Sequence, residues 1–162
     1  MSYPDAKYHG ESGEVTARFR CTDEPPDITY PNGTTVDYLA TGADTDAKFG
    51  LYRWNMSGEP GGAALHFHRT FSESFFVLSG TVRLHNGDEV TDGHAGDYLY
   101  VPEGGLHGFG NESGEPASML ILFSPGAPRE DYFEGLLRMR IGLVMTDEEK
   151  DAFYLAHDNI YV

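Results

Sequence analysis

Glycines and prolines recur at short intervals along the whole of this sequence and separate brief apolar runs. The chain holds 20 glycines and 9 prolines in 162 residues. Because both residue types end regular elements, this spacing is typical of a domain made of many short strands. The Asn86-Gly87 pair, between two apolar runs, is the strongest short signal for a hairpin. The pattern predicts an all-β fold of the sandwich or barrel type.

Nine segments between these breaks have the length and apolar content of strands. They are residues 34–39, 49–56, 64–68, 74–78, 81–85, 89–91, 97–101, 107–111 and 118–123. The stretch before them is polar and is broken by two proline-containing turns, so we expect residues 1–33 to form an arm or lead-in strand. We assign residues 34–126 to a single barrel domain.

Residues 127–162 change from a period of two to a helical period. Pro128 is expected at the first position of a helix, with acidic residues 130–131 in the first turn. The apolar stripe of this helix comprises Tyr132, Phe133, Leu136, Leu137 and the stem of Arg140. A capping box at residues 146–149 predicts a second helix, whose stripe comprises Ala152, Phe153, Leu155 and Ala156. We expect both short helices to pack on the barrel and cover apolar sheet surface.

The charge of the chain narrows the range of partners. Asp and Glu number 26 against 11 Lys and Arg, which gives a formal net charge of -15. Such a chain repels phosphate backbones and anionic lipid headgroups, so we expect neither nucleic acid nor a membrane as a partner. No apolar run approaches the roughly 18 residues of a membrane-spanning helix, and residues 1–10 lack the apolar core of a signal peptide. The expected compartment is the cytoplasm, and the single Cys21 excludes an intrachain disulfide.

Three histidines and one glutamate have the spacing of a metal site. His66 and His68 are two residues apart in a predicted strand, so both imidazoles lie on one face. Glu73 opens the next strand, where its carboxylate can reach the same ion, and His107 can supply a third nitrogen. Such a mixed nitrogen and oxygen site suits Fe, Mn, Co, Ni, Cu or Zn and does not suit calcium.

Two blocks of fixed positions between Gly61 and Asn111 resemble the two sequence motifs of the cupin superfamily. The first block consists of Gly61, His66, His68, Glu73 and Gly80, with the leading glycine one place from its usual position. The second block consists of Gly96, Pro102, Gly104, His107 and Asn111 and matches in full. The chain thus resembles a single-domain, metal-binding cupin.

The resemblance implies a jelly-roll β-barrel with one divalent transition metal inside it. It implies that the ligands are His66, His68, Glu73 and His107, and that Asn111 is structural. Many such cupins are homodimers, so a homodimer is expected, and the arm before residue 34 can pair with the partner. The order of one acidic barrel and a short helical tail is also similar to quercetin-dioxygenase-like cupins and to small cupins of aromatic polyketide pathways.

A set of mostly aromatic residues is expected to form the wall of a substrate site. The alternation of strands places Phe75 and Val77 on the face of Glu73, and Phe109 on the face of His107. The full set is Tyr52, Trp54, Phe75, Val77, Tyr98, Tyr100, Phe109, Met119 and Ile121. An aromatic wall suits a flat, mostly apolar substrate such as a phenol or a flavonoid. The alternative is that these side chains simply fill a small barrel.

Three functions are consistent with such a site. The first is a metal-dependent dioxygenase that acts on a small aromatic or enolisable compound, with Glu73 as both ligand and catalytic proton acceptor. The second is redox-neutral catalysis, as in a cyclase, isomerase or lyase, which the same open Lewis-acid site supports with zinc. The third is a small-molecule-binding barrel without catalysis. The fold does not choose between them.

Overall fold

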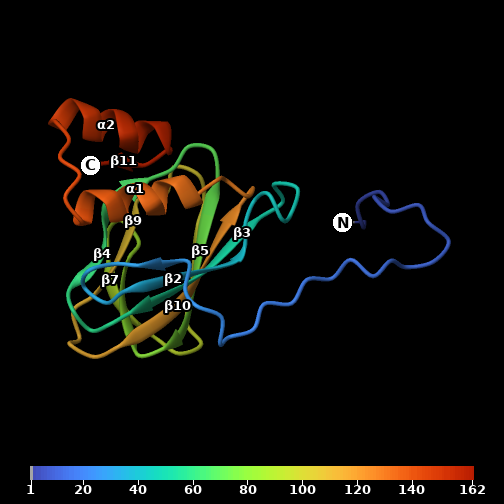
Figure 1. Cartoon of the computed structure of the whole chain (residues 1–162), viewed down its shortest axis with the longest axis horizontal. Helices are drawn as coiled ribbons and strands as arrows, with labels where there is room; N and C mark the ends of the chain where they lie inside the picture. Colours follow the sequence, from blue (N-terminus) through green and yellow to red (C-terminus); the bar gives the residue numbers. More distant parts are fainter. Residues whose placement is uncertain (1) are drawn as a thin grey trace.

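A computed structural model of the protein describes residues 2–162 and contains two antiparallel sheets that face each other (Figure 1). The six-stranded sheet has the order β1-β2-β3-β10-β5-β8, and the five-stranded sheet has the order β11-β4-β9-β6-β7. The strands are β1 (Ile28–Thr29), β2 (Thr35–Ala40), β3 (Gly50–Met56), β4 (Gly61–Phe67), β5 (Ser72–Ser79), β6 (Thr81–His85), β7 (Val90–His94), β8 (Tyr98–Val101), β9 (His107–Asn111), β10 (Ala117–Ser124) and β11 (Ile160–Tyr161). The predicted all-β jelly-roll architecture is confirmed.

Each of the nine predicted segments overlaps one of the strands β2 to β10, with ends that differ by a few residues. Strand β1 lies in the stretch that we expect as an arm or lead-in strand, and β11 was not predicted, because two residues are too few to show a period. Although it lies inside the segment assigned to the arm, β1 pairs with β2 of the barrel through Ile28 opposite Val36. The division into an arm, a barrel and a helical tail stays a prediction.

The core lies between the two sheets and follows from strict alternation along the central strands. In β3, Tyr52, Trp54 and Met56 are buried and their neighbours are partly exposed. In β10, Met119 lies opposite Trp54 and Ile121 lies opposite Tyr52, so the same face of the sheet continues across both strands. Burial of these large side chains supplies the main driving force for closing the two sheets on each other.

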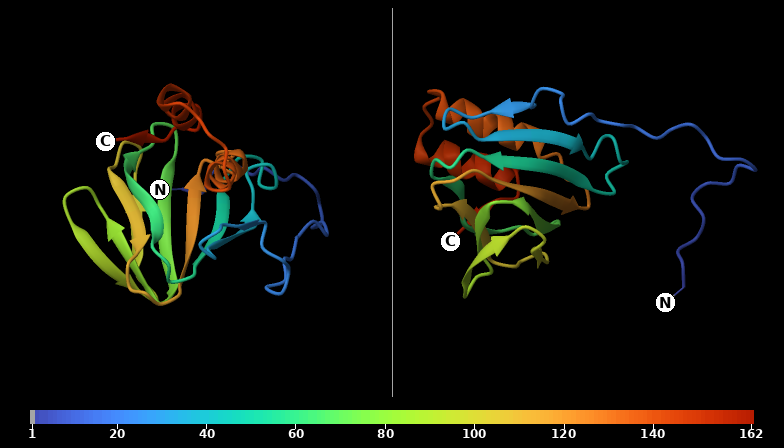
Figure 2. Two further views of the ribbon diagram at one scale, coloured as in Figure 1. Left: turned by 60° about the vertical axis from the view of Figure 1, so that its left-hand side comes forward. Right: turned by 90° about the horizontal axis from the view of Figure 1, so that it is seen from below.

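The two helices, α1 (Glu130–Arg140) and α2 (Asp147–Ala156), lie together over one side of the barrel (Figure 2). Helix α1 begins two residues after Pro128, so the expectation that this proline occupies the first helical position is wrong. Arg129, in helical backbone geometry, stands before the helix instead. Tyr132 and Phe133 point into the core, as their place in the apolar stripe predicts.

Helix α2 packs on α1 through aromatic side chains. The predicted capping box is confirmed: the Thr146 hydroxyl accepts from the backbone N–H of Glu149, whose side chain accepts from the backbone N–H of Thr146. Phe153 stacks on Tyr132 with ring centroids 5.6 Å apart. Leu155, in contrast, is 62% exposed, so the predicted stripe of this helix is only partly buried.

Residues 2–27 form neither helix nor strand, and run along the outside of the barrel and away from it (Figure 1). Arg20 ties the end of this stretch to the barrel through an ion pair with Asp27 (2.8 Å) and a hydrogen bond to the carbonyl of Tyr38. Cys21 in this stretch is exposed. Neither α1 nor α2, the helices of residues 2–162, has the length and apolar content to cross a membrane.

Candidate metal centre

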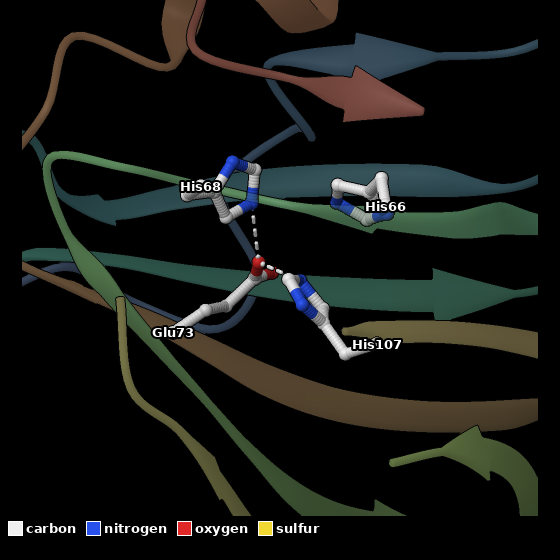
Figure 3. Close-up of side chains that lie close together, drawn as sticks. All are labelled: His66, His68, Glu73 and His107. Atoms are coloured by element: carbon white, nitrogen blue, oxygen red, sulfur yellow. Dashed lines mark hydrogen bonds and ion pairs between the residues drawn. The ribbon is translucent and has the colours of Figure 1, made fainter. Parts of the chain in front are cut away.

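Four buried side chains from three strands converge on one point between the sheets (Figure 3). His66 is on β4, His68 follows the last residue of β4, Glu73 is on β5 and His107 is the first residue of β9. One ligand atom of each residue lies within 4.8 Å of the others. The structure therefore brings together all four residues that the sequence spacing predicted as ligands.

The register of β4 and β9 places two of the imidazoles side by side. His66 lies directly opposite His107, with ring centroids 4.3 Å apart. At the other end of this strand pair, Gly62 has a φ of 149°, and a Cβ there would lie 2.0 Å from the carbonyl oxygen of Phe109. Only glycine allows the two backbones to approach this closely, so Gly62 fixes the strand pair that carries both histidines.

Each of the three imidazoles donates its Nδ1–H to a backbone carbonyl. The pairs are His66 with Ala64 (2.8 Å), His68 with Asp158 (2.6 Å) and His107 with Gly105 (2.9 Å). With the proton held on Nδ1, the lone pair of Nε2 faces the centre, which is the orientation of histidine ligands in metalloproteins. The contact of His68 comes from the C-terminal segment, ninety residues further along the chain.

The contacts of the Glu73 carboxylate indicate that positive charge lies between these side chains. Its Oε2 lies 3.0 Å from Nε2 of His68 and 2.8 Å from Nε2 of His107. A neutral imidazole has only one N–H, and in both rings the carbonyl at Nδ1 takes it. Oε2 of Glu73 and Nε2 of the two histidines can then approach each other only if extra protons or a metal ion lie between them. The donor set therefore fits a divalent transition metal.

Burial and mutual contacts shift the pKa values of these side chains in the metal-free protein. Burial alone would raise the pKa of Glu73, but hydrogen bonds with His107 and His68 hold it well below its usual range. Burial would likewise lower the pKa of His107, but the hydrogen bond with Glu73 raises it. For His66, burial and the neighbouring His107 lower the pKa to about 4. Glu73 is therefore ionised, and His66 is neutral at pH 7, as a ligand must be.

A cavity of about 550 Å³ adjoins this centre. His66 and Glu73 are the two members of the cluster that reach it. Of the nine residues predicted as a substrate wall, Trp54, Phe109 and Ile121 line the cavity. Four others are buried in the core without lining it: Tyr52, Phe75, Val77 and Met119. These four fill the barrel, which was the alternative interpretation.

The wall assignment does not extend to Tyr98 and Tyr100, which are 61% and 53% exposed. They lie on the edge strand β8, where the inward positions belong to Leu99 and Val101. Strand alternation cannot tell which of two alternating sets faces inward when both are apolar, and here the set with two tyrosines faces outward.

Much of the cavity wall comes from outside the two motifs. The β1–β2 turn and the C-terminal segment that holds the two helices and β11 contribute Tyr30, Arg129, Tyr132, Phe133, Leu136, Met139, Tyr154, Asn159 and Tyr161. The sequence predicted that the helices cover the barrel, but not that they help to close a cavity beside the metal centre. The aromatic content of the tail is the one feature that pointed there.

A two-sheet jelly roll with three histidines and a glutamate between its sheets is typical of metal-binding β-barrels. Residues 54–123 match the sequence model of the family described as "Cupin domain". This match identifies residues 54–123 as a cupin domain, and the fold agrees with it, which confirms the resemblance found in the sequence. A search of curated protein sequences found no significant match.

Several solved structures share the fold. KdgF from a Halomonas species is 17% identical, with a TM-score of 0.57 over 67% of this chain and 93% of that one. A predicted oxalate decarboxylase from Thermotoga maritima is 18% identical, with a TM-score of 0.59 over 67% and 99%. The polyketide cyclase RemF from Streptomyces resistomycificus is 25% identical, with a TM-score of 0.55 over 67% and 78%.

Proposed function

We propose that this protein is a metal-dependent enzyme that acts on a small aromatic or enolisable compound held in the cavity. The observation that carries this proposal is the convergence of His66, His68, Glu73 and His107 at the end of an aromatic cavity. When bound, a divalent ion of Fe, Ni, Mn, Co, Cu or Zn supplies an electrophilic centre with open positions for a substrate oxygen. Its positive charge favours the enolate or phenolate form of such a substrate.

The residues of the chain then perform two tasks. Trp54 and Phe109 lie edge to face, with centroids 5.9 Å apart, and offer apolar surface to a flat ring. Glu73 uses Oε2 for both histidine contacts, and its Oε1 makes no hydrogen bond with any other part of residues 2–162. Because Glu73 also lines the cavity, Oε1 is the proton acceptor that we assign to the reaction.

We propose two reaction types in order. The first is the oxygen-consuming reaction of a dioxygenase, as the sequence predicts. The second is a redox-neutral cyclisation, isomerisation or elimination, and the likeness to the polyketide cyclase RemF favours it. In both, removal of a proton from an enolisable carbon or a phenol is the step that Glu73 performs. Oxygen uptake distinguishes them, since only the first depends on dioxygen.

Metal content tests the shared part of this proposal. Elemental analysis of protein purified without added metal is expected to give one transition-metal ion per chain. The substitutions His66→Ala and His107→Ala are expected to remove it, because each deletes one nitrogen ligand. His9→Ala, in the exposed arm, is the control and is expected to keep the full amount. Wild-type protein without metal, or variants that keep it, would overturn the proposed centre.

Measurements of turnover distinguish the two proposed reaction types from a non-catalytic binding barrel. Metal-loaded protein is to be incubated with a panel of phenols, flavonoids and 1,3-diketones in an oxygen electrode and again under strict anaerobiosis. Oxygen uptake that Glu73→Gln abolishes would support the dioxygenase. Product formation without oxygen would support the redox-neutral reaction. Stable binding of panel members without turnover in either condition would support the non-catalytic binding barrel and refute the enzyme.

A further inference from the structure

Arg129 is a buried cation without a partner anion. Its side chain is 3% exposed and lies over the ring of Tyr132, 4.2 Å from the centroid. Its terminal nitrogens donate to the carbonyl of His157 and to Oδ1 of Asn159, both at 2.7 Å, and both acceptors are neutral. Within residues 2–162 no carboxylate lies within 4.0 Å of the guanidinium, and its Nε has no hydrogen-bond partner. The ring centroids of Phe71, Phe123, Tyr132 and Phe133 lie 4.2–5.7 Å from the guanidinium carbon, but a buried charge without a contacting anion is costly, so it calls for an explanation.

The charged residues that line the cavity favour an anionic ligand. Arg129 lines the cavity together with Glu73 and, on the last turn of α1, with the exposed Arg140. Glu73 is the single acidic residue of the lining, although the whole chain carries 26 acidic and only 11 basic side chains. Since Glu73 is committed to the metal centre, a bound divalent ion leaves the interior of the cavity positive.

The free donors of Arg129 suit an oxygen anion. A guanidinium has five N–H groups, and the two hydrogen bonds to His157 and Asn159 leave the others available. Arginine pairs with carboxylates through parallel hydrogen bonds and stays protonated at neutral pH even when burial lowers its pKa, as it does here. The aromatic side chains Trp54, Phe109 and Phe133 line the same cavity and offer apolar contacts.

We propose that the cavity binds aromatic compounds that carry a carboxylate, and that Arg129 pairs with this carboxylate. The inference rests on the proposed function in that it names the substrate class of the same site. The metal centre and Arg129 then hold two different oxygens of one compound, which fixes the orientation of its ring. Arg129 is thus the residue that sets specificity for acids over neutral analogues.

A pair of matched ligands tests this specificity. 1-Naphthoate carries the carboxylate, and 1-naphthamide is its neutral isostere. Trp54 is the single tryptophan of the chain and lines the cavity, so quenching of its fluorescence reports binding. Because a hydrogen bond to a charged group is worth about 1.5–3 kcal/mol, naphthoate is expected to bind at least about tenfold more tightly. Equal affinity of the wild-type protein for both ligands would overturn the proposal without any variant.

Variants separate recognition from structure, because Arg129 also holds residues 157–159. Arg129→Gln is expected to remove the preference for naphthoate while binding of naphthamide changes less than about threefold. Arg138→Gln, on helix α1 but outside the cavity lining, is the control and is expected to keep the preference. If Arg129→Gln weakens both ligands equally, the arginine is structural and the proposal is refuted.

The same titrations are to be run on chelator-treated protein and on protein loaded with Zn²⁺. A preference for naphthoate that persists without metal and depends on Arg129 supports the anion site even if the proposed metal-dependent reaction is wrong. A preference that requires Zn²⁺ and survives Arg129→Gln assigns the carboxylate to the metal centre, and it refutes the role of Arg129 while the proposed function stands.

Discussion

Asp158 connects the C-terminal segment to the metal centre, and its replacement by alanine is the sharpest test of that link. Its backbone carbonyl accepts from Nδ1 of His68, and its carboxylate accepts from the backbone N–H groups of Arg69 and Thr70, both at 2.8 Å. The Thr70 hydroxyl donates to the same oxygen at 2.7 Å. One residue thus fixes both the ring of His68 and the turn that follows it.

The expected loss of stability in Asp158→Ala can be worked out from these contacts. A hydrogen bond to a charged acceptor contributes about 1.5–3 kcal/mol, and the partial exposure of Asp158 brings each of the three closer to about 1 kcal/mol. The backbone at Asp158 has a φ of 54°, a left-handed conformation that costs alanine roughly a further 1 kcal/mol relative to Asp or Asn. We expect Asp158→Ala to lower the free energy of unfolding by about 4 kcal/mol. Changes in contacts that orient a ligand typically cost 10–100-fold in metal affinity, so we expect at least about a tenfold loss.

The assay combines urea unfolding of the metal-free protein with competition for Zn²⁺ against a chromogenic chelator. Asp158→Asn tolerates the left-handed backbone and is expected to lose only about 1 kcal/mol, through its weaker neutral acceptor. Asp151→Ala, at an exposed position of α2, is the control. Wild-type stability and affinity in Asp158→Ala would refute the reasoning. If Asp158→Ala lost stability but kept the wild-type affinity for Zn²⁺, only the proposed link to His68 would be refuted.

Four further outcomes are expected. In the metal-free protein the pKa of His66 is lowered by burial to about 4, whereas the unfolded chain keeps about 6.5, so stability to urea should fall as the pH drops between these values. Metal retention, measured by elemental analysis after dialysis, should fall below about pH 6, because protons compete for the imidazoles. Gly62→Ala should destabilise the protein by about 3 kcal/mol in urea unfolding, since its Cβ would lie 2.0 Å from the carbonyl oxygen of Phe109, while Gly13→Ala, in open space, should not. Light scattering should give about twice the chain mass of 17.9 kDa if the predicted homodimer forms, and the mass of one chain would refute it.

The sequence predicted that the four candidate ligands converge, largely because three of them are close together in the chain. His66 and His68 are related by strand alternation, Glu73 follows after one turn, and His107 follows after further glycine-marked turns. The position of His107 opposite His66 depends on the pairing of β4 with β9 and was predicted from the resemblance, whereas the relations among His66, His68 and Glu73 depend on a few neighbouring residues. The same holds for the capping box of α2, which needs only Thr146 and Glu149.

The cavity could not be predicted because it depends on how distant segments pack. Tyr30, Tyr154 and Tyr161 meet at one cavity only through the docking of the helices and of β11 on β4. The sequence did not single out Arg129, whose burial is visible only once Tyr132 and Asn159 surround it. The outward side of β8 is a second case, since Tyr98 and Leu99 are both plausible core residues by composition alone.

The four ligands belong to both sheets: Glu73 comes from the six-stranded sheet, and His66 and His107 come from the five-stranded sheet. An ion held by all of them would act as a cross-link that fastens one half of the sandwich to the other. Such a cross-link stabilises the native state by about 4 kcal/mol when free ion exceeds its dissociation constant a thousandfold. Loss of the ion would then loosen the seam between the halves, so that the supply of metal in the cell sets the lifetime of the folded protein as well as its activity.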